Sequence, residues 1–229
     1  MAERRSEYVD QLVSEMIPEV ARRHLATGCD VFLDDGAFTH EEARLILDAA
    51  VAAGLAPKIH AGQFTEQHGP ELVAGLPGAL SADHLELISD EGIAAMADAG
   101  VVANLLPGAA FSLRDHFPDG RRLIDGGVPV AVATDNNPGT SRTENLPLMA
   151  SMAVTRMGLD CAEAWRAITT NAARAVGLAD DLGALAPGKR ADLAVFEVPD
   201  YRAFLYHFGM NHAREVFVGG RDAREGCAE

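Results

Sequence analysis

The stretch PVAVATDNNPGTS (residues 129–141) joins a short apolar run to one carboxylate, Asp135, and then to a loop of turn-forming and hydrogen-bonding residues. Earlier apolar runs begin near residues 30, 57, 80 and 101, and patterns typical of helices separate the runs. Short strands that alternate with helices favour a parallel α/β sheet. The runs look continuously apolar, which predicts strands covered on both faces.

Helical signals lie between these runs. Thr39 and Glu42 form a capping box at the start of a helix that ends at Gly54, and Ser89 begins a helix that continues to Ala99. The remaining helices are predicted over residues 7–25, 120–126, 143–157 and 161–176, the last with a capping box at Asp160 and Glu163.

The pattern changes after Gly177. Residues 182–198 predict a turn followed by a strand, and residues 213–223 predict a hairpin about Gly219 and Gly220. We therefore expect a domain over residues 1–178 and part of a small β domain over residues 179–229.

The composition of the chain disfavours some classes of protein. The chain has 229 residues, 48% of them hydrophobic, and a net charge of -15, so it lacks the basic face expected of a nucleic-acid-binding protein. No run of about 18 apolar residues and no signal peptide are present, which predicts a cytoplasmic protein without a membrane partner. The three cysteines are widely spaced and are expected to be reduced.

Polar residues interrupt the strands near their carboxyl ends. They are Asp34, His60, His84 and Asp135, on the first, second, third and fifth runs. Active sites of parallel β/α folds form at that edge, and imidazole and carboxylate groups suit zinc or iron. A single histidine at a strand end is more often structural. The inference of a metal-binding active site therefore depends on the four residues occurring together.

The loop after Asp135 allows two interpretations. A glycine-containing loop before a helix can present backbone N–H groups to an anion or a polar ligand group. The alternative is an ordinary loop with a helix cap. The sequence of the loop alone leaves both open.

Several segments resemble the imidazolonepropionases, a family within the amidohydrolase superfamily. They are KIHAGQF (58–64), SADHLELIS (81–89), VVANLLPGAAFSL (101–113), VAVATDNNPGTS (130–141) and the segment from TTNAARAVGL to LAVF (169–196). The resemblance implies a distorted (β/α)8 barrel with a small β-sandwich. It runs from about Tyr8 to the C-terminus, so the expected fold is α/β, a partial TIM-like barrel (strands 4 to 8) plus the C-terminal strands of the sandwich.

The resemblance also implies catalytic roles. His60 and Asp135 would bind one ion, Zn2+ or Fe2+/Fe3+. Asp135 would also take a proton from the water that attacks, and His84 would polarise the scissile carbonyl. The implied reaction opens the cyclic amide of 4-imidazolone-5-propanoate to N-formimidoyl-L-glutamate, as in histidine breakdown.

Four positions match substrate contacts of that family: Gln63, Asn137, Gly139 and Thr140. Gly62 stands where the family commonly has aspartate. The donors around Asn137 suit a substrate with a carboxylate, which disfavours a deaminase acting on a cyclic base.

The largest departure from the family is the absence of an HxH pair. In the family, this pair supplies two metal ligands from the first barrel strand. We therefore expect a truncated chain that is inactive alone. The alternatives are a non-catalytic fragment or partner subunit, and another amidohydrolase or deaminase. Open sheet edges favour a homo-oligomer.

The other histidines are expected to lie on the surface. They are His24, His40, His68, His116, His207 and His212.

Overall fold

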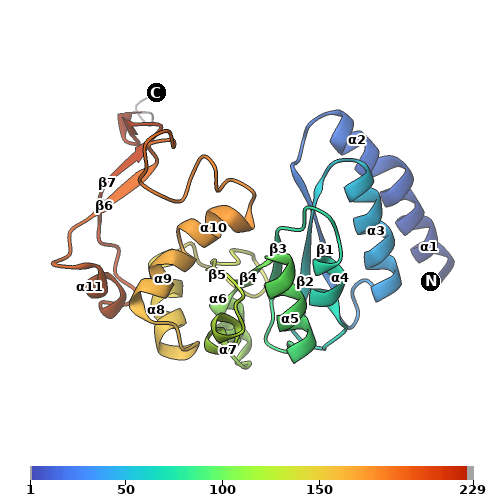
Figure 1. The fold of residues 1–229 in the computed structure, drawn as a ribbon, viewed down its shortest axis with the longest axis horizontal. Coiled ribbons are helices and arrows are strands. Elements are labelled where there is room, and N and C mark those ends of the chain that lie inside the picture. Colours follow the sequence, from blue (N-terminus) through green and yellow to red (C-terminus); the bar gives the residue numbers. More distant parts are fainter. Residues whose placement is uncertain (1, 226–229) are drawn as a thin grey trace. The chain divides into compact units, whose positions relative to one another are not determined.

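The fold comes from a computed structural model that describes residues 2–225 (Figure 1). The chain forms two compact units, one of Met1–Asn104 and Leu123–Pro129, the other of Leu105–Arg122 and Val130–Glu229. One sheet has the strand order β1-β2-β3-β4-β5, and a second has the order β6-β7-β8. The predicted α/β class is confirmed. The predicted domain boundary at residues 178 and 179 stays a prediction.

The first unit holds helices and parallel strands in alternation. Its elements are α1 (Ala2–Gln11), η1 (Leu12–Met16), α2 (Ile17–Arg22), β1 (Gly28–Leu33), α3 (His40–Ala52), β2 (Ala56–Ala61), α4 (Gly69–Ala74), β3 (Ser81–His84), α5 (Asp90–Ala99) and most of β4 (Val102–Leu105). The residues of α7 (Gly120–Asp125) are divided between the two units.

The second unit contains the remaining elements. They are α6 (Pro107–Leu113), β5 (Val130–Val132), α8 (Leu146–Arg156), α9 (Cys161–Ala167), α10 (Thr170–Ala175), β6 (Leu193–Phe196), α11 (Tyr201–Tyr206), β7 (Ala213–Val218) and β8 (Arg221–Asp222). All five predicted strands of the large sheet begin within two residues of the positions expected from the sequence.

Helices cover one face of the sheet formed by the first three strands. Leu33 and Ile59 are fully buried, and both lie against Gly69, the first residue of α4. A Cβ atom added at Gly69 would lie 2.4 Å from the Cβ of Ala61, so glycine permits this close approach of helix to strand.

The prediction of two covered faces is wrong for β1 and β2. Burial alternates along β2, where Ile59 is buried and Lys58 and His60 on either side are only partly buried. The parallel register pairs Phe32 with His60 and His60 with Asp83, so polar groups share the face opposite the helices. The high share of apolar residues in these strands concealed the alternation from the sequence analysis. The few polar residues of the strands all lie on the same face.

The predicted helix starts at caps are confirmed. The hydroxyl of Thr39 accepts a hydrogen bond from the Glu42 amide while the Glu42 carboxylate accepts one from the Thr39 amide. Asp160 and Glu163 form the same reciprocal pair at the start of α9. Ser89 caps α5 through the Gly92 amide.

Several predicted helix boundaries are wrong. The helix expected over 161–176 is two helices, because Thr169 leaves the helical conformation between α9 and α10. The helix expected from residue 143 begins at Leu146, after the Asn145 cap. The first helix begins at Ala2 and contains a π-helical segment. Three short helices, α4, α6 and α11, were not predicted from the sequence.

The second unit has its own apolar core beside the smaller sheet. Phe204 and Leu205 of α11 are buried with Ala150 of α8 and Ala164 of α9. Trp165 packs on Phe204 with ring centroids 4.6 Å apart.

The predicted hairpin is confirmed, since β7 and β8 pair antiparallel around Gly219 and Gly220, which both have positive φ.

The structure of residues 2–225 also bears on the predictions about membrane helices, cysteines and surface histidines. None of the helices in this range is both long and apolar enough to cross a bilayer. Cys29 and Cys161 are free thiols, and Cys227 lies outside the described residues. His212 was expected on the surface, but it is only partly exposed and its Nε2 atom is buried. The ring packs near Phe204, which explains the difference.

Candidate active site

His60 lies near the carboxyl end of β2, on the sheet face opposite the helices. Its Nε2 atom is 2.9 Å from Oε1 of Gln63, which is itself buried. The Phe32 ring lies against the imidazole with centroids 3.7 Å apart. Burial, then the neighbouring His84, lower the pKa of His60 to about 4, while Gln63 and Asp34 act in the opposite direction. His60 is therefore a neutral imidazole at neutral pH, which is the form that binds metals.

His84 is the last residue of β3 and contacts His60 directly. The two rings have centroids 3.9 Å apart and planes inclined at 38°. The register of the strands pairs His84 with Ala61, a residue on the helix-covered face. His84 has φ of 80° and Leu85 has φ of 69°, so the backbone leaves the regular strand conformation here. This departure accompanies the placement of the His84 ring against His60 instead of under the helices.

Asp34 follows β1 and is buried, but its contacts are structural. Its carboxylate accepts hydrogen bonds from the Phe64 amide, the Thr65 hydroxyl and the Asp35 amide. These bonds tie the end of β1 to the loop that carries Gln63. A buried carboxylate satisfied in this way needs no metal ion, so Asp34 fixes the loop beside His60.

Asp135 follows β5 in the second unit and is partly buried. Its φ of 52° lies in the left-handed region, which non-glycine residues seldom adopt. The hydroxyl of Ser141 donates to the carbonyl of Thr134, 2.5 Å away, and holds the ends of the loop together. A Cβ atom at Gly108 would meet that hydroxyl at 2.4 Å, so a larger residue at this position of α6 would displace it.

Asn137 organises the loop that follows Asp135. Its side-chain oxygen accepts hydrogen bonds from the amides of Gly139 and Thr140, both at 2.8 Å. Its side-chain nitrogen donates to the Asp135 carbonyl and to the Thr140 hydroxyl. Asn137 thus occupies N–H groups that one of the two interpretations of this loop assigned to an anion. The roles of Asn137, Gly139 and Thr140 in binding a substrate stay predictions.

A hollow of about 460 Å³ lies beside this loop. Its lining includes Asn137, Arg142 and Glu144. Arg142 is exposed and donates to the Pro138 carbonyl. The hollow offers amide, guanidinium and carboxylate groups, a mixture suited to a small polar ligand.

The first unit thus brings together His60, Gln63 and His84 at the ends of neighbouring strands. Asp135, Asn137, Gly139 and Thr140 share one loop of the second unit. The convergence of Asp135 with the two histidines stays a prediction. The donor set fits zinc or iron, because His60 is held neutral and Asp135 supplies a carboxylate.

A second group of metal-binding side chains lies on the surface of the first unit. The ligand atoms of Glu66, His68 and Glu71 lie within 4.8 Å of one another. The His68 Nδ1 atom is 3.3 Å from Glu71 and 3.5 Å from Glu66. These carboxylates raise the pKa of His68, chiefly through the bond to Glu71. An exposed ion pair accounts for the cluster.

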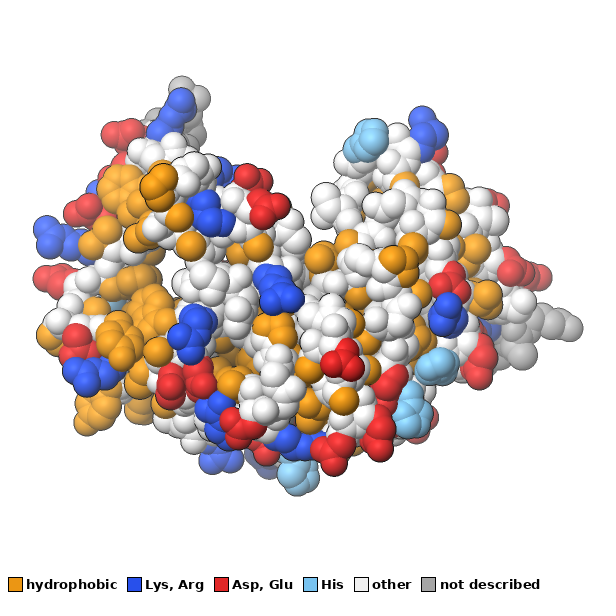
Figure 2. Space-filling model, viewed as in Figure 1, with side chains coloured by type: hydrophobic (Ala, Val, Ile, Leu, Met, Phe, Trp, Pro, Cys, Tyr) orange, Lys and Arg blue, Asp and Glu red, His pale blue; other side chains and the backbone are white. Residues whose placement is uncertain are grey.

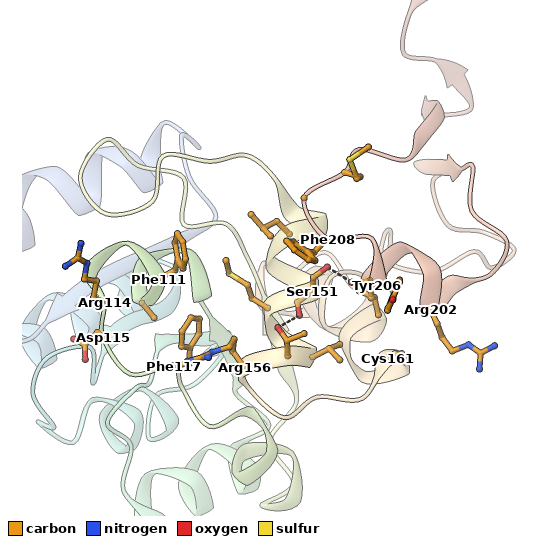
Figure 3. A pocket seen from close by; sticks show the side chains of 18 residues that line it. Phe111, Arg114, Asp115, Phe117, Ser151, Arg156, Cys161, Arg202, Tyr206 and Phe208 are labelled. Carbon is orange, nitrogen blue, oxygen red and sulfur yellow. Dashed lines mark hydrogen bonds between the residues drawn. The ribbon is translucent and has the colours of Figure 1, made fainter.

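Apolar side chains gather over the second unit, on the left of the face in Figure 2. A groove of about 1370 Å³ lies between α6, α8, α11 and the segment after α11. Phe111, Phe117, Tyr206 and Phe208 line it, as Figure 3 shows. Phe208 is 74% exposed and Tyr206 81% exposed. The sequence did not indicate this surface, because large apolar residues in short helices usually signal core.

The sequence profile of the amidohydrolase family matches residues 35–222. The match includes the strand ends that carry His60, His84 and Asp135. The chain belongs to the amidohydrolase family.

Comparison with curated relatives points to a narrower group within this family. The chain is 54% identical over 215 residues to an imidazolonepropionase of Geobacillus kaustophilus, a match that covers 94% of this chain and 50% of the relative. An imidazolonepropionase of Porphyromonas gingivalis is 46% identical over 218 residues, covering 95% of this chain and 51% of the relative. The chain thus spans about half the length of the curated relatives it matches.

Solved structures share the fold at lower identity. A zinc-bound adenosine deaminase of Xanthomonas campestris has a TM-score of 0.70 at 19% identity, covering 85% of this chain and 51% of that one. An atrazine chlorohydrolase of Arthrobacter aurescens has a TM-score of 0.66 at 20% identity, covering 84% and 49%. These likenesses confirm the expected fold, a partial barrel of the amidohydrolase type.

Proposed function

We propose that this chain is part of an imidazolonepropionase, a hydrolase that opens the cyclic amide of 4-imidazolone-5-propanoate to N-formimidoyl-L-glutamate. The observation that carries the proposal is the paired His60 and His84 at the ends of neighbouring strands, in a chain 54% identical to an imidazolonepropionase. The zinc in the adenosine deaminase of the same fold supports a metal-dependent mechanism.

His60 and Asp135 would hold one zinc or iron ion. When bound, the ion supplies a Lewis acid that makes a water molecule a nucleophile near neutral pH. The Asp135 carboxylate would take the proton that the attacking water loses and would return it to the ring nitrogen as the amide C–N bond breaks. His84 would polarise the ring carbonyl that the water attacks.

Gln63 and the loop around Asn137 would bind the substrate. The Gln63 amide is held against His60, so it can contact a ring bound beside that histidine. The hollow beside Asn137 contains Arg142, whose guanidinium suits a carboxylate. A substrate with a propionate arm matches these groups better than an uncharged cyclic base.

We also propose that the protein is a cytoplasmic homo-oligomer. The support is the exposed apolar groove of the second unit. Large apolar patches are common sites of association.

A chimera tests the proposed function. Residues 1–229 replace the matching segment of the Geobacillus kaustophilus relative, and loss of imidazolone absorbance is followed with zinc or ferrous iron. Turnover within about tenfold of the relative supports the proposal. A folded, metal-loaded chimera that hydrolyses another cyclic amide or base, but not the imidazolone, contradicts it.

A further inference from the structure

Glu86 is a buried carboxyl group that the proposed chemistry does not use. It lies two residues after His84, and its side chain is only 3% exposed. Its Oε2 atom is buried and has no hydrogen-bond partner among the described residues. Buried polar atoms in folded proteins nearly always have a partner, so such an atom indicates an interaction that is incomplete in this structure.

The Nδ1 atom of His84 is unsatisfied in the same way. It is buried, the side chain is 2% exposed, and no hydrogen-bond partner for it lies among the described residues. It lies 3.8 Å from Oε1 of Glu86. This separation exceeds a hydrogen bond between a ring nitrogen and a carboxylate by about 1 Å.

The backbone brings these two groups together. His84 and Leu85 both have positive φ, so the chain does not continue as a strand from His84 to Glu86. In a regular strand, side chains two residues apart point to the same face but stand about 6 to 7 Å apart along the chain. The turn therefore places a carboxyl group beside the ring of His84.

We propose that Glu86 is a positioning residue for His84. Its carboxylate accepts a hydrogen bond from the Nδ1–H group of His84, which fixes the ring plane and leaves Nε2 as the nitrogen available to the reaction. A carboxylate bonded to one ring nitrogen selects the tautomer in many histidine sites. The bond also gives a partner to the buried Nδ1 atom of His84.

The chemical consequence rests on the proposed function. With the hydrogen held on Nδ1, His84 can take a second proton on Nε2 when substrate binds, and this Nε2–H group is the donor that polarises the ring carbonyl, while Glu86 balances the positive charge on the ring. The carboxylate itself takes no proton and touches no substrate. This division of roles is the one an aspartate performs for a catalytic histidine in serine hydrolases.

The first experiment reads the tautomer directly in the metal-free 229-residue chain, without an activity assay. Nitrogen-15 NMR of the labelled protein at neutral pH is compared with that of His84→Asn, which assigns the His84 signals. We expect a hydrogen on Nδ1 and an unprotonated Nε2. A His84 ring with its hydrogen on Nε2 overturns the proposal, even if the imidazolone assay succeeds.

Variants then test Glu86 itself. Glu86→Met keeps the bulk but removes the acceptor, and we expect loss of the Nδ1–H tautomer signal. Glu91→Met, at an exposed position of α5, is the matched control and should leave the signal unchanged. A folded Glu86→Met chain that keeps the Nδ1–H tautomer overturns the proposal. If the Glu86→Met variant does not fold, the tautomer measured in the parent chain still decides whether the proposal holds.

The chimera adds a kinetic readout. We expect Glu86→Gln to lower kcat at least tenfold with KM changed less than about twofold, since the carboxylate does not contact substrate. Glu86→Asp should restore part of the loss. A larger effect on KM than on kcat contradicts a positioning role. An inactive chimera rejects the proposed function but leaves the tautomer result standing.

Discussion

The imidazole rings of His60 and His84 lie face to face at a slant, with centroids 3.9 Å apart and planes inclined at 38°. They come from adjacent parallel strands, yet strand register alone would direct them to opposite faces of the sheet. The left-handed backbone at His84 accompanies their contact. Strained backbone of this kind is concentrated at functional sites.

Metal uptake by the chain should depend on His60. Two protein ligands are too few for tight binding, so we expect the 229-residue chain to bind zinc weakly and to lose it on dialysis. His60→Ala should weaken uptake by at least about tenfold, measured by titration calorimetry. His68→Ala is the control. If His68→Ala removes the binding, zinc occupies the surface cluster of Glu66, His68 and Glu71 instead.

Activity should require ligands that residues 1–229 do not contain. The sequence has no HxH pair, so we expect negligible imidazolone hydrolysis by this polypeptide alone. The chimera with the relative should be active, and Asp135→Asn should reduce its turnover by roughly 10²–10⁴-fold, as expected for loss of a proton acceptor. Strong turnover by the 229-residue polypeptide would refute this account of the ligands.

The core of the first unit should be sensitive at Leu47. This residue of α3 is fully buried, and Leu47→Ala should destabilise the protein by about 2–5 kcal/mol through lost burial and a cavity. Leu45→Ala on the same helix removes the same group from a site that is 58% exposed, and it should cost less than about 1 kcal/mol. Urea unfolding followed by circular dichroism compares the two. Equal losses would show that α3 packs differently.

Asp30 should make stability depend on pH. Although the Asp30 side chain is exposed, partial desolvation by the surrounding protein, then repulsion from Asp83, raises its pKa to about 6, while Lys58 and His84 oppose the rise. In the unfolded chain the pKa of an aspartate is about 3.9, so between about pH 4 and 6 the folded state binds more protons. The contribution of Asp30 to stability therefore falls as pH rises through that window.

The matching variant is Asp30→Asn. It should be more stable than the parent above pH 6, by less than about 1 kcal/mol because the residue keeps access to solvent, and equal to it near pH 4. Unfolding midpoints in urea at pH 4, 5, 6 and 7 give the comparison. Asp98→Asn, at an exposed position of α5, is the control. A constant difference across all four pH values would exclude titration of Asp30 as the cause.

The chain should associate through the apolar groove of the second unit. We expect a mass above the 24.2 kDa of one chain in light scattering. Phe208→Ser should shift the mass toward the monomer, because Phe208 is 74% exposed in the groove. Leu185→Ser removes a residue that is 84% exposed outside the groove, and it should leave the mass unchanged. Association that persists in the Phe208 variant would exclude the groove as its cause.

The sequence by itself determined the alternation of strands and helices, the caps at Thr39 and Asp160, and the hairpin at Gly219 and Gly220. Each of these depends on interactions between residues close in the chain: a side chain that bonds an amide three residues away, or glycines that accept positive φ. Local chemistry of this kind can be identified without knowing which segments meet.

Only the tertiary structure decided which polar groups face one another. The stacking of His60 on His84, the enclosure of Asp34 by the next loop and the approach of Glu86 to the ring of His84 depend on register and on left-handed backbone at His84. The carboxylate of Asp34 looked like a site residue because strand ends carry both functional and structural groups. The difference lies in its partners: a satisfied buried carboxylate stabilises a loop, whereas an unsatisfied one, such as that of Glu86, can still bond a neighbouring side chain.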